Sequence, residues 1–285
     1  MKLPDSLDVP VVLLLLMTPM VLRNEFIVSA AVVAAIYSVL TLSWFFLERQ
    51  AGWVSLSHSI PFGLAAYAVA IDPVFLLPAF TLSLILFLLT SKLGRERFTF
   101  ATFILTVVFW YISHYFVVKV DGHYIGGEEG FSFESIGTVN AYMLSATLVA
   151  VTLIALYLIS KSPLGLKIAA VRDDELAARS IGIGAEMVKT ISFTISAIFA
   201  TLAGICYILY FGHVSPEVFS IEVSLIPFIA SLLAGRRWMS PVVGSYAIVM
   251  VSRAFAGLPE AHLILYALVL IISPWLNRWW DVRSG

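Results

Sequence analysis

Long runs of apolar residues, separated by short polar breaks, fill almost the whole chain. A helix needs about 20 apolar residues to cross the hydrocarbon core of a bilayer, and several runs are near that length. We therefore expect an all-α, polytopic membrane bundle of about ten transmembrane helices, forming a single domain over residues 1–285. The expected spans are 9–22, 26–47, 54–70, 74–90, 98–120, 137–160, 187–211, 221–235, 239–256 and 261–276.

Two of these spans are short and contain helix-breaking residues. The run 54–70 contains Pro61 and Gly63, and the run 221–235 contains Pro227. Broken helices often line a pathway in transporters, because unpaired backbone groups are tolerated in a membrane only where protein or water covers them. A tilted or kinked helix in a bundle is an equally good interpretation of the same pattern.

Small residues recur every four positions in the run 187–211. They are Ser196, Ala200 and Gly204. Small side chains at this spacing allow two helices to approach closely, so we expect a tight helix–helix contact here, with no chemistry implied.

The basic residues indicate an orientation. If the N-terminus is cytoplasmic and every run crosses the membrane, all of the 17 Lys and Arg residues except Arg23, Lys119 and Arg253 lie on the cytoplasmic side. Cytoplasmic loops carry an excess of Lys and Arg, so this distribution predicts that both termini are cytoplasmic. No small-residue cleavage site follows Lys2, and we expect the first run to be a retained span rather than a signal peptide.

The composition agrees with lipid as the solvent. The chain is 60% hydrophobic and 12% charged, with a mean hydropathy of +0.97, whereas soluble domains carry about 25% charged residues. The formal net charge of −1 gives no electrostatic reason to expect nucleic acid as a partner. The single cysteine, Cys206, excludes an internal disulfide and a cysteine-based metal site.

Two polar loops interrupt the apolar pattern. Residues 121–136 are acidic, glycine-rich and predicted to be external, whereas residues 161–186 form the long cytoplasmic loop. The second loop is typical of short helices, and we expect Asp173 to cap a helix of about eight residues that stops at Gly182. Its acidic first turn argues against binding to anionic lipid and favours a docking helix for a cytoplasmic partner. One face of this helix would carry Leu176, Ala177, Ser180 and Ile181.

The chain carries no recognisable motif for catalysis or energy coupling. The nearest approach to a phosphate-binding loop has Ile183 and Val188 where glycines must stand, so any ATP hydrolysis belongs to another chain. An ion-coupled carrier needs ionisable groups at mid-membrane, and only His58 and His114 lie deep. A lone histidine in a span is more often a hydrogen-bonded helix contact than a proton relay. We predict no catalytic residue, no metal site and no cofactor held by this chain.

Three segments match a known family. Residues 52–67 (GWVSLSHSIPFGLAAY) are similar to G-x-x-S-L-G-H-x-x-F-x-x-x-G-A-Y, with Ser57 in place of a glycine. Residues 126–131 (GGEEGF) are similar to G-G-x-x-G-[LI], and the longest match covers residues 163–216, including A-[IV]-R-[DE]-[DN]-E-x-A-A-x-x-x-G-I. The chain thereby resembles the LivM-type permeases, the membrane subunits of branched-chain amino-acid ABC importers. It departs from them at residues 234–244, where few glycines of the family's glycine-rich motif remain.

The resemblance implies a transport subunit rather than an enzyme. Such a permease works in the prokaryotic plasma membrane with a second permease subunit, two cytoplasmic ATPase subunits that bind ATP and Mg²⁺, and an extracytoplasmic substrate-binding protein. Branched-chain amino acids are the expected substrate, and urea or short amides are the alternative within the family. A secondary carrier that needs no ATPase is the alternative from another class.

The resemblance also assigns three groups of residues. The coupling helix for the ATPase would comprise Arg172, Asp173, Asp174, Glu175, Ala177, Ala178 and Gly182. The translocation pathway would include Ser55, Ser57, His58 and Tyr67, with packing between helices as the alternative. Contacts with the binding protein would fall on Gly126, Gly127, Gly130, Ser215 and Pro216, which could instead be ordinary loop residues.

Overall fold

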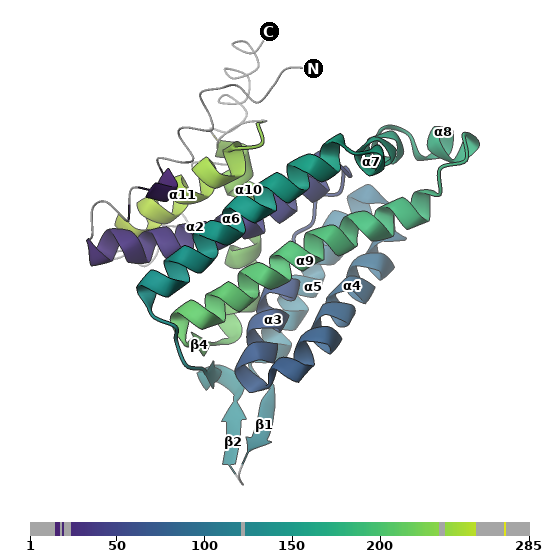
Figure 1. Cartoon of the computed structure of the whole chain (residues 1–285). Coiled ribbons are helices and arrows are strands. Elements are labelled where there is room, and N and C mark those ends of the chain that lie inside the picture. The colour runs from purple at the N-terminus through teal and green to yellow at the C-terminus, as the bar shows by residue number, and fades with distance from the viewer. Residues whose placement is uncertain are drawn as a thin grey trace.

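The computed structural model shows long helices lying side by side, with two short helices at one end and two small β-ribbons at the other (Figure 1). It describes residues 15–17, 19, 24–120, 123–233, 237–254 and 271. The expected spans 9–22 and 261–276 therefore fall almost entirely outside the described residues, as do both termini. We call the two ends of the bundle the α8 end and the β end, after the elements that they carry.

Eight helices within the described residues coincide with expected spans. They are α2 (Glu25–Arg49), α3 (Ser59–Ile71), α4 (Leu76–Ser91), α5 (Arg95–Ser113), α6 (Thr138–Lys161), α9 (Ala185–Phe211), α10 (Ile221–Leu233) and α11 (Ser240–Ala254). Four described segments are long and apolar enough to cross a membrane: Glu25–Arg49, Pro73–Ser91, Thr138–Lys161 and Ala185–Phe211. The expectation of a helical membrane protein is confirmed.

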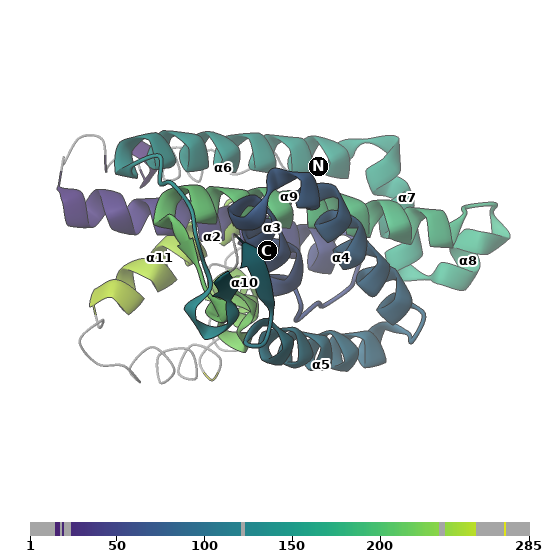
Figure 2. The same ribbon diagram turned by 90° about the horizontal axis from the view of Figure 1, so that it is seen from below.

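Helix α2 lies at the centre of the bundle. From Ala30 to Leu47 its side chains are buried, apart from that of Tyr37, and it packs against α6, α9, α10 and α11. Figure 2 shows α6 and α5 on opposite sides of the layer that holds α2 and α9. A helix that is apolar all round is expected in such a position, since every face must meet protein or lipid.

Two pairs of helices touch through glycine. A Cβ atom placed on Gly204 of α9 would lie 2.0 Å from the carbonyl oxygen of Phe62 in α3. A Cβ atom on Gly244 of α11 would lie 2.0 Å from the carbonyl oxygen of Ala230 in α10. The backbones are in direct contact at both places, so the tight contact expected from the small-residue spacing in 187–211 is confirmed.

The all-α expectation needs a correction at the β end. Helix α5 stops at Ser113, and β1 (Val117–Val120) pairs antiparallel with β2 (His123–Gly126) in a hairpin that projects beyond the bundle (Figure 1). A second pair, β3 (Phe131–Ser132) with β4 (His213–Val214), joins the loop before α6 to the residues after α9. The β-branched residues of β1 favour a strand over a further helical turn.

Candidate functional site

The third expected span, 54–70, is only partly helical. Residues 53–57 form no helix, and α3 begins at Ser59 with His58 in the N-cap position. The non-helical part precedes α3, and α3 itself continues through Pro61 and Gly63, so the structure shows a shortened helix and not one broken at these residues. Helix α10 likewise continues through Pro227.

Threonine side chains of α5 hold the non-helical segment. The hydroxyl of Thr99 donates to the carbonyl of Val54 (2.9 Å), and that of Thr106 donates to the carbonyl of Leu56 (2.7 Å). The N–H of Leu56 donates to Thr102 Oγ1 (3.1 Å). These threonines share one face of α5, since they lie three, four and seven positions apart. Backbone that leaves a helix at membrane depth must find such partners, because no water is present to supply them.

Two further helices bond to this region. The indole N–H of Trp44 in α2 donates to the carbonyl of Ser55 (2.7 Å). From α10, Ser224 Oγ accepts the N–H of Ser59 (3.2 Å) and its hydroxyl donates to Ser59 Oγ (2.7 Å). The segment is thus fixed from α2, α5 and α10 together.

His58 connects the segment to α9 at the centre of the protein. Its side chain is fully buried, and its Nε2 lies 2.9 Å from Ser196 Oγ, whose hydroxyl donates to the carbonyl of Ser43 (3.0 Å). Because the Ser196 hydroxyl already donates its proton to the carbonyl of Ser43, it can only accept from His58. We therefore infer that Nε2 carries the imidazole proton and donates a hydrogen bond to Ser196 Oγ. The Nδ1 atom then is an acceptor, and it has no hydrogen-bond partner among the described residues.

The four predicted pathway residues are all buried, but they do not form one group. Ser55 Oγ and Ser57 Oγ lie 3.2 Å apart beside His58. Tyr67 lies farther along α3 towards the β end, where its ring contacts those of Phe131 and Phe219 and borders an apolar cavity of about 400 Å³ between α3, α4 and α5.

The double substitution Thr102→Val and Thr106→Val should lower the thermal unfolding temperature of the purified protein. Valine keeps the shape but leaves the N–H and C=O of Leu56 unpaired, and each buried unpaired group costs roughly 1–3 kcal/mol. The matched control is Thr147→Val on α6, where the exposed hydroxyl bonds only to Met143 of its own helix. Equal unfolding temperatures for the double variant, the control and the wild type would show that the threonines do not hold the segment.

The predicted cap of the short helix is off by one residue. At the α8 end, α7 spans Pro163–Asp173 and α8 spans Glu175–Ser180. Asp174, not Asp173, caps α8: its carboxylate accepts the N–H groups of Leu176 (2.9 Å) and Ala177 (3.0 Å). Asp174 has an extended backbone, which ends α7 at Asp173 and leaves α8 six residues long rather than about eight. The stop at Gly182 is as expected, with φ at +83°.

Arginines fasten α7 to the bundle. The Arg172 guanidinium donates to the carbonyl of Arg49 at the end of α2 (2.6 Å). Arg95, the first residue of α5, donates to the carbonyls of Arg172 (2.6 Å) and Val171 (3.1 Å). Arg172, predicted as part of the coupling helix, therefore binds its own chain.

Ion pairs anchor α8. Glu175 Oε1 accepts from Arg179 (2.5 Å) and from Lys189 Nζ in α9 (2.8 Å), and Glu186 Oε1 also binds both cations, at 2.8 and 3.3 Å. Partial burial raises the pKa of Glu175, but hydrogen bonds and charge from Lys189 and Arg179 outweigh this effect, and the pKa lies below its usual range. Glu175 therefore stays ionised and bound to its own chain.

The outer face of α8 is apolar. Leu176 is 78% exposed and Ile181 is 74% exposed, while Ala178 is buried against the bundle. The face expected from helical spacing, which carries these two residues with Ala177 and Ser180, is exposed along its whole length. Leu176 and Ile181 are therefore large apolar side chains exposed beside the charged side chain of Arg179.

At the β end, most of the glycines predicted as contacts face inward. Gly127, Gly130 and Pro216 are buried, and Gly126 and Ser215 are partly exposed. The exposed surface of these loops includes aromatic and acidic side chains from the same stretches of sequence. They are Tyr115, Tyr124, Glu128, Glu129 and Glu217.

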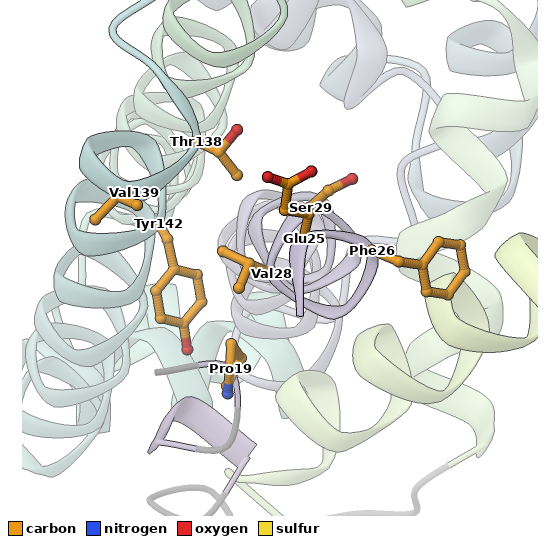
Figure 3. Close-up of a pocket in the computed structure, with 8 residues that line it drawn as sticks. All are labelled: Pro19, Glu25, Phe26, Val28, Ser29, Thr138, Val139 and Tyr142. Atoms are coloured by element: carbon orange, nitrogen blue, oxygen red, sulfur yellow. The ribbon is translucent and has the colours of Figure 1, made fainter. Parts of the chain in front are cut away.

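A cavity of about 810 Å³ opens at the β end between the starts of α2 and α6. Figure 3 shows Tyr142 of α6 pointing towards Pro19, and Phe26 on the opposite side of α2. Glu25 and Ser29 also line it, and the guanidinium of Arg253 in α11 donates to Ser29 Oγ (2.7 Å). An acidic and a basic side chain are therefore close to one turn of α2.

Comparison with known proteins assigns the chain to a family. The family model described as "Branched-chain amino acid transport system / permease component" matches residues 26–274. The chain belongs to this family. It is 34% identical over 112 residues to the high-affinity branched-chain amino acid transport system permease protein LivM of Escherichia coli K12, and equally to that of Salmonella typhimurium LT2. The match covers 39% of this chain and 26% of each relative. No solved structure matches significantly.

The family is a transport permease component, and the family match together with the long apolar helices indicates a multi-pass membrane protein. Among its described residues, no group of His, Cys, Asp and Glu side chains could hold a metal ion. Part of its departure from the family's glycine motif, residues 234–236, lies outside the described residues. Within the described part, Trp238 packs edge-on against the rings of Phe45 (5.5 Å) and Tyr157 (6.0 Å), so the connection before α11 is held to α2 and α6.

Proposed function

We propose that the chain is the membrane-spanning permease subunit of an ATP-driven ABC importer in a prokaryotic plasma membrane. The α8 end lies in the cytoplasm, the β end lies outside, and ten spans leave both termini cytoplasmic. The observation that carries the proposal is the α8 end, where a capped helix is bound inward by ion pairs and presents Leu176 and Ile181 outward. A surface of this kind suits an ATPase subunit, and the family match supports it.

The anchoring of α8 explains how a partner could drive the bundle. Two ATPase subunits bind ATP and Mg²⁺, and their closure moves α8. Because α7 and α8 are bonded to α2, α5 and α9, a displacement of α8 reaches the helices that hold the segment 53–57. The pathway forms with a second permease subunit, and the exposed aromatic and acidic residues of the β end receive the binding protein.

Branched-chain amino acids are the proposed substrates. Glu25 lines the cavity of about 810 Å³ at the β end, and Arg253, which lines a second cavity of about 370 Å³, bonds to Ser29 of the first, so opposite charges lie near the place where a substrate would enter. A zwitterionic amino acid complements both charges, whereas neutral urea or a short amide complements neither as well. The relatives' names, which specify branched-chain amino acids, point the same way.

The test is retention of the ATPase subunits during purification from membranes. The double variant Leu176→Asp and Ile181→Asp should bind the ATPase at least about tenfold more weakly than the wild type, since losing two apolar anchors removes more than about 1.4 kcal/mol of binding. Tyr124→Asp, equally exposed but at the β end, is the matched control and should retain the ATPases fully. If the wild type binds no ATPase yet transports substrate in vesicles, the chain is a secondary carrier and the proposal is wrong.

A further inference from the structure

Lys189 in the first turns of α9 is the point where three elements meet. Its side chain is only 10% exposed. Its Nζ binds Glu175 of α8 and Glu186 of α9, and it lies 5.5 Å from the centre of the Trp53 ring. An ammonium group can serve carboxylates and an aromatic face together, because its charge is compact and it carries three donors.

Trp53 is the first residue of the non-helical segment 53–57, and its position is closely fixed. Its ring packs edge-on against Phe98 of α5 (5.0 Å) and Phe193 of α9 (5.6 Å). The backbone N–H of Trp53 donates to the carbonyl of Leu47 near the end of α2 (3.1 Å). A displacement of the ring would therefore act on the segment that leads to His58.

A cavity beside Trp53 and Lys189 leaves room for these side chains to move. Trp53, Glu175 and Lys189 border a cavity of about 570 Å³, which Lys92 and Arg95 also line. Arg179 of α8 also binds Glu186 of α9 (2.8 Å), so α8 would keep an ion pair to α9 after the loss of Lys189. What Lys189 adds is the connection between α8 and Trp53.

We propose that Lys189 is a positioning residue that transmits movement of α8 to the non-helical segment through Trp53. The proposal rests on the function proposed above, in which an ATPase moves α8. It does not place Lys189 in contact with either the ATPase or the substrate. Its loss should therefore separate ATP hydrolysis from transport.

The experiment compares Lys189→Met with the wild type in the complete transporter, reconstituted into proteoliposomes. Lys189→Met should retain the ATPases and hydrolyse ATP within about twofold of the wild type, while substrate uptake falls about tenfold, as expected when an interaction that matters only for the coupled step is lost. Trp53→Leu should give the same uncoupling. The double variant should be no worse than either single one, because both act in one connection.

Two further variants separate this role from a general structural one. Lys161→Met is the matched control: Lys161 lies over the ring of Tyr157 (5.6 Å) at the end of α6, with no carboxylate partner among the described residues, and its loss should leave coupling unchanged. Lys189→Arg retains a cation for both the carboxylates and the ring and should restore part of the uptake.

Wild-type ratios of uptake to hydrolysis in Lys189→Met would overturn the proposal. So would a loss of ATPase retention that matches the loss of uptake, since Lys189 would then serve docking or folding. A wild-type chain that binds no ATPase would defeat the proposed function itself, and this inference with it. Measuring ATPase retention by the wild type first distinguishes that outcome from a failure of the Lys189 proposal alone.

Discussion

Gly204→Leu should abolish the accumulation of folded protein in the membrane. The first side-chain atom alone would lie 2.0 Å from the carbonyl oxygen of Phe62, a distance that requires α3 and α9 to separate. Overpacking costs typically 1–3 kcal/mol where side chains can shift, and more is expected where the obstacle is backbone. A native state that is stable by only about 5–15 kcal/mol cannot lose both this contact and the packing around it.

The effect should be graded. Gly204→Ala should lower the thermal unfolding temperature in detergent, and Gly204→Leu should leave no monodisperse peak in size-exclusion chromatography. Gly184→Leu is the matched control, because Gly184 precedes the same helix and its nearest atom to an added Cβ is 3.9 Å away, in Met187. Wild-type yield and unfolding temperature for Gly204→Leu would contradict the close approach of α3 and α9.

The helices were predictable because membrane thickness sets their length. Apolar runs locate α2, α4, α6 and α9 to within a few residues, and the small-residue spacing around Gly204 locates a helix contact. The sequence predicted helix up to residue 120, and the change from helix to strand after Ser113 could not be predicted in the same way. Residues 117–120 continue the apolar run, and only pairing with His123–Gly126 makes them a strand.

The position of the non-helical segment could not be predicted from the sequence alone. Pro61 and Gly63 indicate an irregular span, but both lie inside α3. What stabilises the non-helical segment before it is the face of α5 that carries Thr99, Thr102 and Thr106, far along the chain. The role proposed for Lys189 could not be predicted from the sequence for the same reason, since Trp53 becomes its neighbour only in the folded bundle.

The sequence patterns predicted the surroundings of the two candidate sites to different degrees. Helical spacing was sufficient to predict which residues share one face of α8, but not that this largely apolar face would be exposed, since an apolar helix face ordinarily packs against the core. A glycine motif does not tell whether its residues are exposed or packed. At the β end Gly127 and Gly130 are buried, and their value lies in the turns and close contacts that they permit.

Gly130→Ala should eliminate uptake that depends on the binding protein while leaving the helical bundle and ATPase retention intact. Gly130 has φ +70° and ψ −154°, a backbone region essentially restricted to glycine, and strain of this kind costs other residues roughly 1–3 kcal/mol. In addition, its Cβ would lie 2.0 Å from the carbonyl oxygen of Val214, so β3 and β4 could not remain paired. That pair joins the loops before α6 and after α9, and its loss should disorder the surface proposed to receive the binding protein.

Gly137→Ala separates the two causes. Gly137 lies in the same loop with a φ of +83°, but no atom lies within 4 Å of an added Cβ. This control should therefore show the backbone strain alone and keep most of the uptake. The measurements are the affinity of the loaded binding protein for the reconstituted transporter and substrate uptake. If Gly130→Ala binds and transports like Gly137→Ala, the β3–β4 connection is not needed for docking, and the hairpin of β1 and β2 must supply the contact instead.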